Sequence, residues 1–95
     1  MAIPDISTEL RQSLDRHRFS LRPQPEARSG EKTVHLVLDH GAEALHAGRV
    51  DFHLGLWSAF AVVRGHGLFR SEEVSRHETF EEAVLAVLAN FTHLE

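Results

Sequence analysis

The first periodic pattern of apolar residues lies near the N-terminus. Ile6, Leu10 and Leu14 recur at a spacing of four, with charged and polar residues between them. This spacing places apolar side chains along one face of a helix. The pattern therefore predicts an amphipathic helix over residues 5–18.

Apolar and polar residues alternate in two later stretches, residues 33–39 and 49–57. A period of two is typical of a strand with one buried face. We expect these two strands to pair antiparallel through a connection over residues 40–48. The side chains predicted to face inward are Val34, Leu36, Leu38, Val50, Phe52, Leu54 and Leu56, whereas Asp51, His53 and Trp57 are predicted to face outward.

Shorter patterns complete the predicted sheet. Residues 59–64 are predicted to form a further strand, which either continues the strand 49–57 across a bend or follows a tight turn. Residues 68–74 are predicted to form a more polar edge strand after a glycine-rich turn. Phe19 and Leu21 favour a short edge strand, and the proline-containing segment 22–31 is predicted to be an internal loop.

The clearest pattern lies near the C-terminus, where apolar residues follow a helical period over residues 79–92. Thr79 is followed three positions later by Glu82, the spacing of a capping box at the start of a helix. The segment is therefore predicted to be a helix that packs on the core. Its apolar face comprises Phe80, Ala83, Val84, Val87, Leu88 and Phe91.

The predicted element order is helix, three to four strands, helix. Because each helix has one apolar stripe and the sheet has one apolar face, two layers are enough to bury all of them. The sequence thus predicts an α+β two-layer sandwich, with an N-terminal and a C-terminal helix packed on one face of an antiparallel sheet. The predicted core comprises Leu10, Leu14, Val34, Leu36, Leu38, Phe52, Leu54, Phe60, Val62, Val84, Val87, Leu88 and Phe91.

Length and composition fit a single small globular domain over residues 1–95. The chain is 42% hydrophobic and 25% charged, and its length supports one core. The uncharged run from Leu54 to Val63 is half of the roughly 20 residues that a membrane helix needs. The chain has no cysteine and no recognisable secretory signal, so we expect a cytoplasmic protein. The closing residues 94–95 could be a cloning scar.

The charge distribution disfavours nucleic acid as a partner. Residues 1–32 hold six basic and five acidic side chains, whereas residues 33–95 hold four and nine. The element order is shared with the double-stranded-RNA-binding domain, but that family carries lysines at the start of its last helix. This chain has Glu78, Glu81 and Glu82 there, and carboxylates repel phosphates. We therefore expect a protein partner, with neither nucleic acid nor membrane involved.

Eight histidines raise the question of a metal site. If the predicted hairpin pairs Leu38 with Val50, His35 lies opposite His53 with Asp51 nearby, and these groups are zinc ligands. However, the chain has no cysteine and no tight histidine motif. We therefore predict no metal and no cofactor, and keep His35, His53 and Asp51 as the weak candidates.

Other candidate chemistry fails on spacing. His40 and His46 are six residues apart, which on a helix would turn them about 120° from each other. The serines Ser58, Ser71 and Ser75 lie outside any nucleophile elbow, and no phosphate-binding glycine loop is present. We therefore expect a protein that is not an enzyme.

A small protein-interaction or regulatory module of unknown partner is the favoured function. Trp57, predicted to face outward, is the expected anchor, because exposed aromatic residues often dominate interfaces. An outer sheet face carrying Val37, Trp57 and Ala59, Ala61 or Val63 also predicts a homodimer.

Two alternatives stay open. The first is a compact acidic inhibitor, of immunity or phage-encoded type, that covers a basic nucleic-acid-binding surface of a target protein. The second is a histidine-based metal-binding protein. The acidic residues of the first alternative are Glu72, Glu73, Glu78, Glu81 and Glu82.

Overall fold

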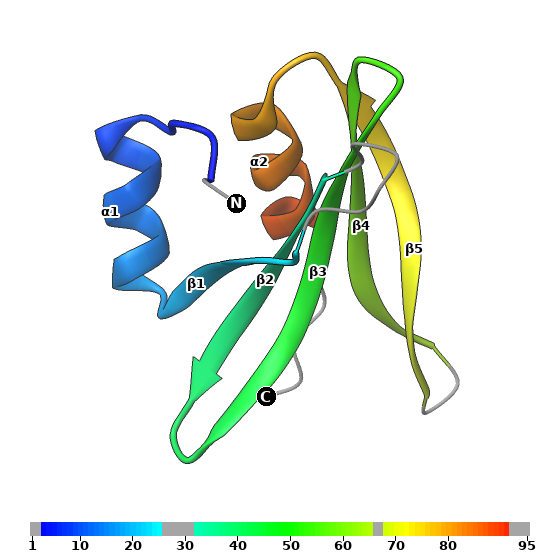
Figure 1. The fold of residues 1–95 in the computed structure, drawn as a ribbon. Helices are drawn as coiled ribbons and strands as arrows, with labels where there is room; N and C mark the ends of the chain where they lie inside the picture. The colour runs from blue at the N-terminus through cyan, green and yellow to red at the C-terminus, as the bar shows by residue number, and fades with distance from the viewer. Residues whose placement is uncertain (1–2, 26–31, 66–67, 92–95) are drawn as a thin grey trace.

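The computed structural model describes residues 3–25, 32–65 and 68–91. Five antiparallel strands form one sheet in the order β1-β2-β3-β4-β5, so each strand pairs with its neighbours in the chain (Figure 1). The α+β class with two flanking helices is confirmed, and the sheet has five strands instead of three to four. The elements are α1 (Thr8–Arg16), β1 (Phe19–Pro23), β2 (Lys32–His40), β3 (Glu43–His53), β4 (Leu56–Gly65), β5 (Leu68–His77) and α2 (Phe80–Asn90).

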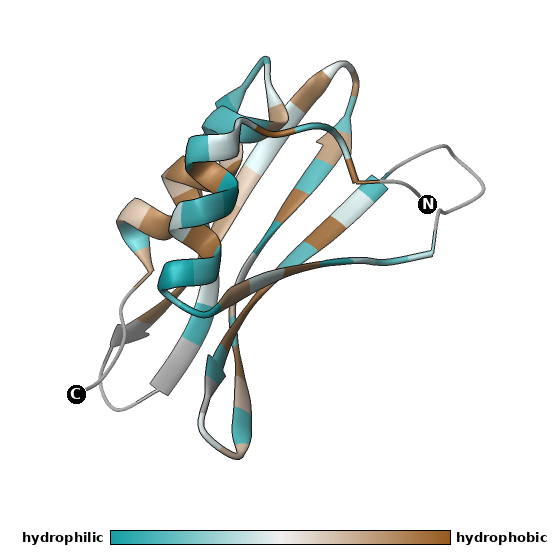
Figure 2. Ribbon diagram, turned by 90° about the vertical axis from the view of Figure 1, so that its left-hand side faces the viewer, coloured by the Kyte–Doolittle hydropathy of each residue, from teal (hydrophilic) through white to brown (hydrophobic). Residues whose placement is uncertain are grey.

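Both helices lie on the same face of the sheet, as predicted (Figures 1 and 2). α2 packs on β3, β4 and β5, and α1 packs on β1. We call the sheet face under the helices the inner face and the opposite one the outer face. Among the described residues, no helix has the length and apolar character needed to cross a membrane. The predicted cloning scar at 94–95 and most of the predicted loop 22–31 fall outside the described residues.

Each helix begins at a side-chain cap. The amide of Glu82 donates a 3.2 Å hydrogen bond to Thr79 Oγ1, and that hydroxyl donates to Glu82 Oε1 at 2.8 Å. The predicted cap of α2 is therefore confirmed, with the carboxylate bound to the hydroxyl of the capping residue. In α1 the amide of Leu10 donates to Ser7 Oγ at 3.1 Å, so this helix starts later than predicted.

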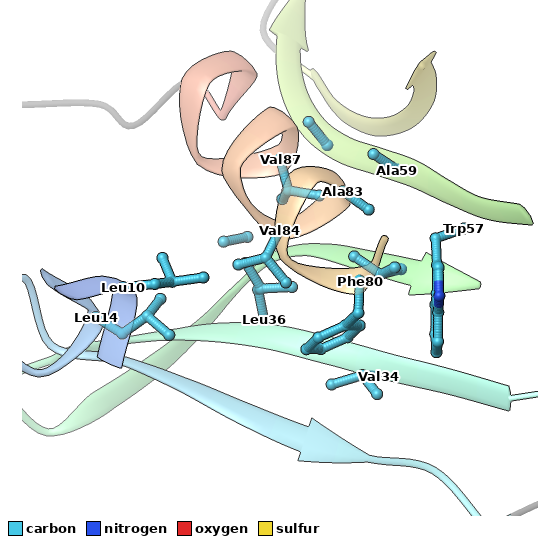
Figure 3. Close-up of a cluster of buried hydrophobic side chains, with 13 residues drawn as sticks. Leu10, Leu14, Val34, Leu36, Trp57, Ala59, Phe80, Ala83, Val84 and Val87 are labelled. Carbon is cyan, nitrogen blue, oxygen red and sulfur yellow. The ribbon is translucent and has the colours of Figure 1, made fainter. Parts of the chain in front are cut away.

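The core lies between the helices and the inner face (Figure 3). The predictions for Leu10, Leu14, Val34, Leu36, Val84 and Val87 are confirmed, because all of these side chains are buried. Phe52, Leu88 and Phe91 are partly buried against the core, and Leu38 is also only partly buried. The buried residues that pack together in this core are Leu10, Leu14, Val34, Leu36, Ala47, Val50, Trp57, Ala59, Ala61, Phe80, Ala83, Val84 and Val87.

The predicted orientation of the β4 side chains toward the two sheet faces is wrong. The alternating pattern predicts one continuous strand over residues 49–57, but a turn interrupts this segment. Leu54 and Gly55 have φ angles of 52° and 82°, as in the two-residue turns of β-hairpins. Phe52 therefore pairs with Trp57, and the inward positions change from even to odd numbers. Trp57, Ala59 and Ala61 are buried in the core. Phe60 and Val62 lie on the outer face, where Val62 is nevertheless buried as predicted, and Leu54 is exposed at the turn.

The predicted register of β2 and β3 is also wrong. The two strands are joined by a tight turn at Gly41-Ala42, and the expected connection over 40–48 is largely part of β3. His35 consequently pairs with Arg49, and His53 pairs with Leu56 on the other side of β3. The register also shifts at Leu36/Val37, where Ala47 forms a β-bulge in β3.

Gly48 allows α2 to lie close to the sheet. A Cβ atom at this position would fall against the backbone oxygen of Phe60 and 2.6 Å from Val87 Cγ1. We expect Gly48→Ala to lower the free energy of unfolding by roughly 2–3 kcal/mol, because both the backbone of β4 at Phe60 and helix α2 at Val87 must move in a well-packed core. Urea denaturation followed by circular dichroism measures the change.

Gly41→Ala is the matched control. Gly41 has a φ angle of 64°, and a methyl group added there would have no neighbouring atom within 4 Å. This substitution therefore costs only the backbone strain of about 1 kcal/mol. Equal losses in the two variants would show that the close packing of α2 is not the reason for glycine at position 48.

Candidate interaction site

The outer face of the sheet is polar and carries most of the side chains that could contact a partner. Strand alternation and register place two cross-strand rows there. Neither helix covers this face (Figure 2). One row comprises Thr33, Asp51, Ser58 and Arg76, and the other comprises Arg22, His35, Arg49, Phe60 and Glu73.

A network of polar contacts holds the centre of this face. Asp51 accepts hydrogen bonds from Thr33 Oγ1 at 2.9 Å and from Arg49 Nε at 3.1 Å. The guanidinium carbon of Arg49 lies 4.0 Å from the centre of the Phe60 ring, which is a cation–π contact. Asp51, a weak metal candidate from the sequence, is therefore engaged with an alcohol and a guanidinium group.

Two imidazoles meet beside this network. His35 Nδ1 and His46 Nε2 are 3.0 Å apart, and His35 Nε2 lies 2.8 Å from Gln24 Oε1. Since an amide oxygen only accepts, His35 carries its proton on Nε2 and accepts from His46 on Nδ1. Partial burial lowers the pKa of His46 below its ordinary value, and the nearby His35 and Arg49 lower that pKa further.

The histidine pair differs from the one expected from the sequence. The structure brings His35 to His46 and leaves His53 at the far end of β3. Among the described residues, no group of three His, Cys, Asp or Glu side chains is placed to hold a metal ion. His46, one of the two histidines of the observed pair, belongs to the segment from His40 to His46. A helix would turn these two residues away from each other, but this geometry is wrong because the segment forms a hairpin.

A groove lies at the end of the sheet where β3 turns into β4. Its volume is about 560 Å³. Leu54 and Leu56 are 87% and 38% exposed at its apolar side, and Asp51, Glu73 and Arg76 are among its polar walls. The complete lining is Lys32, Thr33, Asp51, Phe52, His53, Leu54, Leu56, Ser58, Phe60, Glu73 and Arg76.

The two apolar residues predicted as interaction anchors do not form an exposed patch. The expected outward orientation of Trp57 is wrong. Its side chain is only 8% exposed, and its ring lies 4.7 Å from that of Phe52. The Trp57 ring also lies 5.0 Å from that of Phe80 (Figure 3). Val37 is on the outer face by register but only 9% exposed. The apolar outer face on which the homodimer prediction was based is therefore not present in the described part of the chain.

The predicted acidic surface is largely engaged in contacts within the chain. Glu72 pairs with Arg70 at 2.6 Å, and Glu73 pairs with Arg76 at 2.7 Å. Glu81 accepts hydrogen bonds from the amide and the hydroxyl of Ser7, at 2.7 and 3.0 Å. The structure therefore shows Glu81 as a link between the start of α1 and the first turn of α2, and not as a freely solvated side chain.

Known family models, curated proteins and solved structures provide no match to this chain. The chemistry of the site thus follows from the geometry of its own residues.

Because Glu81 binds Ser7, we expect the replacement of Glu81 to lower the free energy of unfolding more than the replacement of Glu73. Glu81→Ala should lower the free energy of unfolding by about 1 kcal/mol, because two donors lose a charged acceptor. Amide hydrogen exchange in α1 should also become faster. Glu73→Ala removes an exposed ion pair and should change stability by less than about 0.5 kcal/mol. Equal effects would contradict a structural role for Glu81.

The lowered pKa of His46 predicts a pH effect with a defined sign. The unfolded chain takes up a proton near pH 6.5, whereas folded His46 does so only at lower pH. Its contribution to stability is therefore complete above pH 6.5 and is lost as the pH falls from 6.5 through the lower pKa of folded His46. Histidine NMR titration with a chelator present should give a midpoint below 6.5 for His46, and His35→Gln should raise it. A midpoint above 6.5 would contradict the structure.

Proposed function

We propose that the protein is a small non-catalytic interaction module that binds a partner protein through the groove beside the β3–β4 hairpin. The observation that carries this proposal is the conformation of Leu54. This residue has a φ angle of 52° and a side chain that is 87% exposed. The turn requires this φ angle, but the exposed leucine side chain is not part of the core.

An exposed leucine alone is ordinary on a protein surface, but the backbone conformation of Leu54 is not. The left-handed region costs a non-glycine residue roughly 1–2 kcal/mol. Asparagine or aspartate followed by glycine is the usual choice in such turns. A turn selected only for stability would therefore not carry leucine at position 54, which supports a role of this side chain in contacts outside the chain.

The surroundings of Leu54 support the same proposal. Leu56 adds a second exposed apolar side chain, and both border a groove whose walls include charged residues. An apolar centre with a polar rim is the usual composition of a protein interface. The groove has the volume to take a few side chains from a partner. We therefore replace Trp57 by Leu54 as the proposed anchor.

The other expectations remain proposals. An interaction module needs no catalytic group, and a cytoplasmic location remains an expectation from the sequence. The acidic-inhibitor alternative gains no support from the structure, because Glu72, Glu73 and Glu81 have partners within the chain. No observation on the described residues favours it over the groove.

Leu54→Asn tests the proposal by separating stability from binding. Asparagine tolerates the left-handed conformation, so the variant should be more stable by about 1 kcal/mol, equivalent to a rise of roughly 4–8 °C in Tm for a domain of this size. The partner should be lost at the same time, because the apolar anchor is gone. Thermal denaturation and quantitative affinity capture from the source lysate measure the two effects.

Leu85→Gln is the matched control. Leu85 is 48% exposed on α2, so this variant also removes an exposed leucine but leaves the groove intact. We expect the partner protein to be captured by the Leu85→Gln variant and not by the Leu54→Asn variant. If the two variants capture the same proteins as the original chain, the groove is not the binding surface.

A further inference from the structure

The two imidazoles on the outer face have the arrangement of a pair of metal ligands. His35 Nδ1 and His46 Nε2 face each other at 3.0 Å. Two nitrogen ligands at 2.0–2.1 Å from a tetrahedral ion are about 3.3 Å apart. A metal ion can bind between them if the rings turn so that both lone pairs converge, and if the proton of His46 moves from Nε2 to its Nδ1.

Gln24 fixes the orientation of one imidazole. Its Oε1 accepts a hydrogen bond from His35 Nε2 at 2.8 Å, which leaves the lone pair of Nδ1 directed at His46. Metal-bound histidines almost always donate their other ring N–H to an oxygen in this way. The contact between Gln24 and His35 thus supplies the outer-shell part of such a site.

The β-bulge in β3 is a second, independent observation. Leu36 pairs with Gly48, and an uninterrupted register would set His46 opposite Leu38, toward the inner face. The bulge sets His46 opposite Val37 instead, on the outer face next to His35. Bulges that redirect a side chain occur preferentially next to functional sites.

In the described part of the chain, the positive and negative side chains around the two imidazoles are equal in number, so their net charge does not repel a cation. Arg49 is close enough to His46 to affect its pKa, and its guanidinium is paired with Asp51 at 3.1 Å. Strand alternation places Arg22 and Asp39 on the same face. Among the described residues, the charged side chains that share this part of the face are therefore two guanidinium and two carboxylate groups.

We propose that His35 and His46 form a two-imidazole site for a divalent transition metal ion of the zinc, nickel and copper group, with Gln24 as the positioning residue. Imidazole favours these ions, whereas calcium and magnesium prefer oxygen ligands. The two protein ligands leave coordination positions open to water or to a group on a partner. This inference does not depend on the proposed function of the groove.

The test uses protein without an affinity tag. Zinc chloride and nickel chloride are titrated calorimetrically, and histidine side-chain NMR signals are followed in parallel. We expect a single equivalent of metal to shift or broaden the signals of His35 and His46. Magnesium chloride should cause no such change.

Substitutions assign the site. His35→Gln and His46→Gln should each weaken metal binding by roughly 10-fold or more, and Gln24→Leu should weaken it by roughly 10-fold, as expected for an outer-shell partner. His17→Gln is the control and should leave the affinity unchanged, since His17 lies at the end of α1 with its ring bonded to Ser13 O. Circular dichroism confirms that each variant is folded.

Two results would overturn the proposal. The first is the absence of zinc and nickel binding by the folded protein. The second is an affinity that stays the same in the double variant of His35 and His46, which would assign the metal to other histidines.

Discussion

The two-residue turn at Leu54-Gly55 determines which side chains of β4 pack under the helices. Since neighbouring residues of a strand point to opposite faces, a turn one residue longer or shorter would invert the whole strand. The observed turn pairs Phe52 with Trp57 and directs Trp57, Ala59 and Ala61 to the inner face. The large aromatic side chain then packs against Phe80 at the start of α2.

The small inward residues of β3 and β4 explain the position of α2. Gly48 and Ala61 are paired neighbours on the inner face, and Val87 of α2 lies directly above Gly48. Larger side chains there would hold the helix away from the sheet and open a gap around Ala83 and Val84, both of which are fully buried. The close approach of α2 to the sheet therefore depends on the turn, because the turn directs the small side chains of β4 to the inner face.

Sequence periodicity predicted the elements better than it predicted their facing. Strand β2 and helix α2 are regular over most of their length, so one period describes each of them, whereas β5 contains a bulge at Val74. The alternation of 49–57 continues without a break through the turn, because Leu54 occupies a position where asparagine or glycine would have indicated a hairpin. The alternation therefore extends the predicted strand through the turn, and the predicted faces of Trp57 and Phe60 are exchanged.

The histidine pair escaped prediction for a similar reason. A bulge adds one residue to a strand without any obligatory residue type, and only the bulge opposite Leu36/Val37 brings His46 beside His35. The candidate residues His35 and Asp51 were correctly placed on the outer face, but their partners were not. Pairings across strands depend on register, and register depends on turns and bulges that the apolar pattern does not encode.

Both irregularities of β3 affect the outer face. The inner face of this strand is fixed by Ala47, Gly48 and Val50, which are all buried. The bulge lies near one end of the strand and redirects His46, and the strained turn lies at the other end and presents Leu54. An asparagine-glycine turn would give β4 the same facing. The bulge, however, keeps Leu45 opposite Leu38 on the inner face, where a regular strand would place His46. Packing of the core therefore gives a reason for the bulge, whereas the exposed side chain of Leu54 has no such reason.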